Sequence, residues 1–185
     1  MNNWLTVAIV VGLGLVLLNR NALASVLGVY RPVRYPPNSP ELIALLEQAA
    51  IAAGLPVWWA REKSAHKLIE LESNGCVGRP NYTIPGWADR KKWPAIVAKL
   101  RAGQSIPGDS DAAGLGQLLP SNMKAYAPAG IKGYGDPLQE AIGFLRYVHD
   151  RYGSPDVALS VYGKIATYTH GATGKTKKKT FKEGY

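Results

Sequence analysis

Apolar and polar residues in the body of the chain recur at the spacing of an α-helix. Ser39 is a suitable N-cap, Pro40 suits the first helical position, and Gly54 ends the apolar run that follows. The same reading predicts further helices at residues 56–71, 94–101, 136–152 and 154–161, and a short one capped by Ser121. Since no alternating strand pattern is longer than four residues, we expect a mostly α domain.

The N-terminal residues form a separate apolar segment. Residues 4–18 contain one polar member, Thr6. A helix of that length spans ~22 Å, less than the ~30 Å hydrocarbon core of a bilayer, but about twenty-five residues would be enough. Residues 1–30 are therefore predicted to be an apolar anchor helix that crosses a membrane or is buried in a protein assembly. Residues 22–24 also resemble a signal cleavage site, but no basic residue precedes the apolar run.

The charges around this segment indicate its orientation. Arg20, Arg31 and Arg34 all follow the apolar run, which by the positive-inside rule leaves the body on the cytoplasmic side. Residues 31–40 are rich in proline and are predicted to form a stiff connector. Residues 41–185 then make up the folded domain.

Composition and charge limit the kinds of protein that this chain can be. The single cysteine, Cys76, excludes an intramolecular disulfide, and the three scattered histidines give no metal-ligand spacing, so neither a metal nor another cofactor is expected. The net charge is +9, yet residues 41–156 hold 13 basic and 12 acidic side chains, which argues against nucleic acid as a partner. The lysines at 177–179 are typical of a solvated loop. Phe181 and Tyr185 after them favour an end that folds back onto the domain.

One acidic residue lies on an apolar helix face. Glu72 shares the face of Ala65, Leu68 and Ile69, whereas Glu70 points toward solvent. A carboxyl group on an apolar face loses hydration, which keeps it protonated nearer neutrality, as a general acid requires. The alternative is a partly exposed residue at the end of a helix.

Two further features are compatible with a polar ligand. Residues 110–120 are rich in glycine and small side chains, which permits close backbone approach, and Gln117 offers both a donor and an acceptor. Aromatic residues such as Trp87, Trp93 and Tyr162 could line carbohydrate subsites. Each feature alone also fits an ordinary loop or a core residue.

The order of these features resembles a known family. Glu72-Ser73 at a helix end, Gly-Leu-Gly-Gln at 114–117 and Tyr162 near the end of the domain resemble the lysozyme-like lytic transglycosylases of the soluble-transglycosylase type, especially the domains of phage virion and tape-measure proteins. The family pattern is Glu-Ser, Gly-Leu-Met-Gln and a Tyr-bearing motif. Here glycine replaces the usual methionine at position 116 and the usual asparagine at position 163.

The resemblance implies a function and a site. Its fold would be lysozyme-like, and Glu72 would be the catalytic acid/base that cleaves the β-1,4 bond between MurNAc and GlcNAc and leaves a 1,6-anhydro product, with no metal or other cofactor. The residues that would bind the glycan are Ser73, Gly114, Leu115, Gln117 and Tyr162.

The implied partners and the alternatives follow from the same reading. The partners would be a peptidoglycan strand, a membrane reached through the N-terminal helix, and other virion proteins of a phage that opens the host envelope at entry. One alternative is a goose-lysozyme-like hydrolase that uses Asp109 or Asp111 as a second carboxylate. The others are a non-catalytic structural or wall-binding virion protein and a membrane-tethered nucleic-acid binder.

Overall fold

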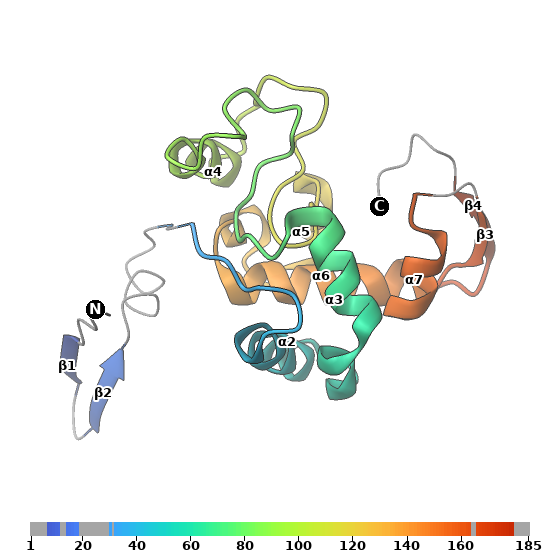
Figure 1. Cartoon of the computed structure of the whole chain (residues 1–185), viewed down its shortest axis with the longest axis horizontal. Helices are drawn as coiled ribbons and strands as arrows, with labels where there is room; N and C mark the ends of the chain where they lie inside the picture. Colours follow the sequence, from blue (N-terminus) through green and yellow to red (C-terminus); the bar gives the residue numbers. More distant parts are fainter. Residues whose placement is uncertain (1–6, 12–13, 19–29, 31, 164–165, 180–185) are drawn as a thin grey trace. The chain divides into compact units, whose positions relative to one another are not determined.

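The computed structural model describes residues 7–11, 14–18, 30, 32–163 and 166–179. The chain divides into two compact units, residues 1–31 and 32–185 (Figure 1). Each unit is described by itself. The predicted return of Phe181 and Tyr185 onto the domain concerns residues outside the described ranges.

The first unit corrects the predicted anchor helix. Strands β1 (Val7–Val11) and β2 (Gly14–Leu18) pair in antiparallel register, with Val11 opposite Gly14. β1 consists mostly of β-branched residues, and glycines at 12 and 14 disfavour a helix, so local preference outweighs the even apolar pattern. Residues 19–29 of the predicted helix lie outside the described part. No helix among the described residues is long and apolar enough to cross a bilayer.

The second unit confirms the mostly α prediction. Its long helices are α2 (Pro40–Ala53), α3 (Lys63–Ser73), α4 (Trp93–Arg101) and α6 (Pro137–Tyr152). Its shorter elements are the 3-10 helices η1 (Val57–Arg61) and η2 (Gly130–Gly133) and the helices α5 (Pro120–Tyr126) and α7 (Pro155–Val161).

The predicted helix starts depend on side-chain caps, and three of them are confirmed. Ser39, Asp136 and Ser154 each accept a hydrogen bond from the backbone amide three residues further along the chain, and each is followed by proline. Gly54 ends α2 in the left-handed conformation, with φ +70°. The caps thus define α2, α6 and α7 at their N-terminal ends.

Three local predictions were wrong. The single helix expected at 56–71 is divided into η1 and α3, because Glu62 between them is extended. Helix α5 begins at Pro120 after an extended Leu119, so Ser121 lies inside it and does not cap it. An antiparallel hairpin, β3 (Ala166–Thr169) with β4 (Thr176–Lys179), includes the lysine run that was assigned to a loop. Its strands are only four residues long, too short for the alternation rule to detect.

Helix α6 is the centre of the domain. It contacts α2, α5 and α7, and α3 packs in turn against α7 (Figure 1). Helical spacing gives α6 one apolar face, which is buried except for the half-buried Leu138: Ala141, Ile142, Leu145, Val148 and Tyr152. Phe144 and Tyr147 lie outside this face and are buried as well. α6 is therefore surrounded on more sides than an amphipathic surface helix.

Part of the predicted connector belongs to the domain. Tyr35 donates its amide to Gly75 O at 2.8 Å, and Val77 donates to Val33 O at 3.0 Å. The Arg34 guanidinium donates two hydrogen bonds of 2.9 Å to Asn74. Residues 33–35 thereby pair with the loop that follows α3.

This pairing predicts where the chain can be shortened. Removing residues 1–31 should leave the melting temperature of the domain nearly unchanged, because the second compact unit begins at Pro32. Removing residues 1–36 should lower it by several degrees, because the loop after α3 loses its partners. Calorimetry of the two truncated proteins tests this, and equal melting temperatures would contradict it.

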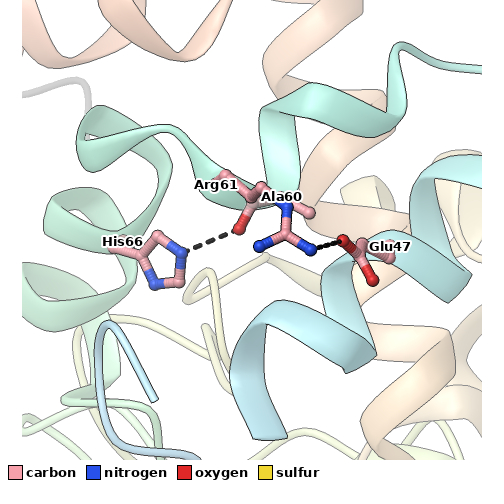
Figure 2. A network of polar contacts seen from close by, with 4 residues as sticks. All are labelled: Glu47, Ala60, Arg61 and His66. Atoms are coloured by element: carbon pink, nitrogen blue, oxygen red, sulfur yellow. Dashed lines mark hydrogen bonds and ion pairs between the residues drawn. The ribbon is translucent and has the colours of Figure 1, made fainter. Parts of the chain in front are cut away.

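A buried histidine fixes the start of α3. His66 is 2% exposed; its Nε2 donates to Ala60 O at 2.8 Å (Figure 2), and its Nδ1 accepts from the Asn38 amide at 3.0 Å. The amide donor requires an unprotonated Nδ1, so the ring is the neutral Nε2–H tautomer. Beside it, Arg61 and Glu47 form an exposed ion pair of 2.7 Å (Figure 2).

The two contacts in Figure 2 should contribute unequally to the free energy of unfolding. His66→Phe keeps an aromatic ring but leaves the buried Ala60 carbonyl and the part-buried Asn38 amide without their partner, so the free energy of unfolding should fall by ~1–3 kcal/mol. Arg61→Ala removes only an exposed ion pair and should cost less than ~1 kcal/mol. Urea unfolding measures both, and a His66→Phe loss no larger than that of Arg61→Ala would refute the assignment.

Candidate functional site

Glu72 is the penultimate residue of α3. The predicted apolar face is confirmed, since Ala65, Leu68 and Ile69 are fully buried while Glu72 at its end is half-buried. The helix ends at Asn74 in the left-handed conformation, with φ 53°. The carboxyl group therefore stands where an apolar face reaches the end of its helix.

Tyr162 lies next to Glu72, although ninety residues separate the two in the sequence. It directly follows α7, and its phenol forms a side-chain hydrogen bond with the Glu72 carboxyl. Burial, and then the charge of Glu72 and this bond, raise the pKa of Tyr162 above its usual value. The phenol is consequently neutral at physiological pH and acts as the donor. The structure thus brings together two predicted site residues from distant parts of the sequence.

This pair defines what the site can do chemically. A phenol that donates to a carboxylate favours the charged form of that carboxylate and restricts its rotation. The apolar face of α3 acts in the opposite sense, because loss of hydration favours the neutral form. A carboxyl group under both influences is suited to give up a proton and take one back.

Ser73 lies in a different environment from the one expected. Its side chain is fully buried, and its hydroxyl donates to Ile69 O at 3.3 Å and accepts from the Gly75 amide at 3.2 Å. Ser73 stabilises the turn after α3. Its burial does not support the glycan contact predicted for it.

The Gly-Leu-Gly-Gln loop is tied to the chain that follows α3. Gln117, with φ 45°, donates from Nε2 to Arg79 O at 2.8 Å and accepts at Oε1 from Asn81 at 3.3 Å. Gly114 also donates to Arg79 O, at 2.9 Å, and Leu115 is fully buried. Gly114 and Leu115 therefore shape the loop from inside, and Gln117, which is half-buried, joins it to residues 79–81.

Glu140 is a site residue that the sequence analysis missed. It lies in the first turn of α6 and is 2% exposed. Oε1 accepts from the amides of Gly135 at 2.6 Å and Gly78 at 3.0 Å, and Oε2 accepts from Leu115 at 2.9 Å. One buried carboxyl group thus holds three loop segments through their backbones.

The environment of Glu140 acts on its ionisation in two directions. Burial raises its pKa, the three amide donors lower it and the nearby charge of Asp136 raises it; the net result is a pKa of about 7. No pattern in the sequence singles out Glu140, because its partners are backbone amides from three distant loop segments.

The remaining residues for which a role was predicted are Asp109, Asp111, Trp87 and Trp93. Asp109 is exposed, and the half-buried Asp111 acts on Tyr134, whose pKa its charge helps to raise after burial and the charge of Glu140. In the segment before them, the buried Trp93 donates its indole N–H to Trp87 O at 2.7 Å. One predicted aromatic residue thus bonds to the backbone of the other.

Comparisons with protein families, curated proteins and solved structures found no match. Within the described residues, no group of three or more His, Cys, Asp or Glu side chains is placed to hold a metal ion. The features of the chain that bear on its function are therefore the geometry around Glu72 and the resemblance of its motifs.

The raised pKa of Glu140 predicts a pH-dependent stability. Between the ordinary carboxyl pKa of 4.5 and about 7, the folded state keeps a proton that the unfolded chain has lost. The free energy of unfolding should therefore fall by up to ~3 kcal/mol as the pH rises through this window. Unfolding curves at several pH values for wild type and Glu140→Gln isolate this contribution. The same slope in both proteins would exclude it.

Proposed function

We propose that residues 32–185 form a peptidoglycan lytic transglycosylase in which Glu72 is the catalytic acid/base. The observation that carries the proposal is the hydrogen-bonded pair of Glu72 and Tyr162. The pair joins α3 to the residue that follows α7, a helix that packs against α3 although the two are far apart in the sequence. The substrate is the glycan strand, cleaved at the β-1,4 bond between MurNAc and GlcNAc.

The reaction needs one group that changes its protonation state twice. Protonated Glu72 donates its proton to the glycosidic oxygen as the bond to C1 of MurNAc breaks. The resulting carboxylate then removes the proton of the C6 hydroxyl, whose oxygen closes onto C1 to give the 1,6-anhydro end. The proton returns to Glu72 and no water is consumed. The Tyr162 phenol orients the carboxyl group and stabilises its charged intermediate form.

The placement of the other acids favours this route over hydrolysis. Glycoside hydrolases generally use two carboxylates ~5–9 Å apart. Glu140 is fully buried and its oxygens accept backbone amides, which makes it a poor base for a water molecule. Asp109 is exposed, and the charge of Asp111 acts on Tyr134.

The biological setting is part of the proposal. The motifs resemble those of domains in phage virion and tape-measure proteins, so we place the activity in a phage particle that opens the host envelope at entry. In that setting residues 1–31 attach the domain to a membrane or to other virion proteins. The enzyme then acts on the cell envelope of the host.

Glu72→Gln is the decisive variant. It preserves the size of the side chain and removes the transferable proton, so cleavage of purified peptidoglycan should be abolished while the circular dichroism spectrum and melting temperature stay close to wild type. The matched control is Glu70→Gln, two residues earlier on the exposed face, which should retain full activity. Mass spectrometry of the wild-type digest should show products lighter by one water than hydrolytic products.

The other outcomes identify the alternatives. Hydrolytic products that depend on Asp109 or Asp111 would establish a hydrolase. Undiminished activity of Glu72→Gln would refute the site assignment, and an inactive wild type that binds peptidoglycan would indicate a wall-binding protein. Tyr162→Phe adds a graded test, because it removes only the hydroxyl and should slow cleavage without abolishing it.

A further inference from the structure

The buried carboxyl group of Glu140 connects the segments that surround the candidate site. Gly78 lies six residues after Glu72, Leu115 belongs to the Gly-Leu-Gly-Gln loop, and Gly135 precedes α6. These segments are distant in sequence and share this one acceptor. We call this set of hydrogen bonds the Glu140 clamp.

We propose that Glu140 is a positioning residue for the reaction at Glu72, and that it acts as a carboxylate whose hydrogen bonds fix the loop after α3 and the Gly-Leu-Gly-Gln loop relative to each other. The inference rests on the proposed function, because the reaction it serves is the one assigned to Glu72. In this role Glu140 does not contact the glycan, and it acts in its charged form.

The chain between Glu72 and Gly78 transmits the position of the clamp. Residues 75–78 are all buried, and Val77 donates to Val33 O at 3.0 Å. A Cβ atom at Gly75 would collide with the carbonyl of Tyr35. A segment packed this closely has few alternative arrangements, so a shift at Gly78 displaces the end of α3.

The Gly-Leu-Gly-Gln loop is shaped to receive the carboxylate. Gly114 has φ +85°, and a Cβ atom there would lie 2.6 Å from Glu140 Cδ. Only glycine permits both this conformation and this approach. The adjacent Ala113 pairs with Pro80, so the loop is also attached to the chain that continues from Gly78.

The geometry of the clamp suits a charged carboxyl group. Both oxygens accept backbone amides, and a proton on either would replace an acceptor with a donor that faces N–H groups. The ionisable groups around it are Asp136 at the start of α6, the Tyr134 phenol before it, Asp111 near Tyr134, and Arg79 after Gly78. Burial and Asp136 together bring the pKa of Glu140 to about 7. The clamp therefore changes its charge close to neutral pH.

The first test shifts the clamp without removing it. Asp136→Asn deletes the charge that raises the pKa of Glu140, and asparagine caps α6 as well as aspartate does. The rate of release of 1,6-anhydro products from a soluble peptidoglycan fragment should rise with pH through about 7 in wild type. In Asp136→Asn this rise should move to lower pH with an unchanged plateau. The same midpoint in both proteins would overturn the proposal.

The second test removes the carboxylate. Glu140→Gln should lower kcat by roughly 10- to 100-fold above the midpoint, leave KM within about twofold, and abolish the acidic limb of the profile. Glu70→Gln should leave all three unchanged. A wild-type profile in Glu140→Gln would overturn the proposal even if overall activity fell through instability.

A measurement that does not depend on activity separates the positioning role of Glu140 from the proposed function. In wild type the amide resonances of Gly78, Leu115 and Gly135 should titrate with one midpoint, which Asp136→Asn lowers and Glu140→Gln removes. Independent or absent titrations would overturn the clamp, while cleavage by wild type would still support the proposed function. Joint titration in a protein that releases no 1,6-anhydro product would refute the proposed function, and the positioning role with it.

Discussion

The domain depends on one constraint: a carboxyl group taken out of water has to be satisfied by backbone donors. Glu140 meets that constraint with the amides of Gly78, Leu115 and Gly135. Because these donors belong to loops that lack regular hydrogen-bonded structure, the same bonds that solvate the charge also order the loops. As the pH rises through neutrality, Glu140 loses its proton. This loss lowers the stability of the fold and at the same time strengthens the hydrogen bonds that order the loops.

Local chemistry made much of the helical framework predictable. Ser39, Asp136 and Ser154 are caps whose side chains act on amides three residues away, so their effect is contained in a short stretch of sequence. The apolar face that leads to Glu72 follows from helical period alone. The secondary structure of the N-terminal segment was predicted wrongly, because an unbroken apolar run does not distinguish a helix from the strands β1 and β2.

Site residues could be predicted from the sequence only where a residue type at a given position has one common role. An acid at the end of an apolar face indicated Glu72, and the order of motifs indicated Tyr162. Ser73 and Leu115 carried no such signal, because whether a small or apolar residue faces a ligand or the core is decided by the packing around it. Glu140 was missed since its partners are backbone amides, which any sequence supplies.

The pairing of residues 33–35 with the loop after α3 has a mechanical consequence. If residues 1–31 are held by another structure, a pull along the chain enters the domain at Val33, Arg34 and Tyr35. The load then falls first on their hydrogen bonds to residues 74–77, a few residues beyond Glu72. Tension on the N-terminal segment would act on the end of α3 before it reached α6, so the candidate acid lies close to the point where force enters the fold.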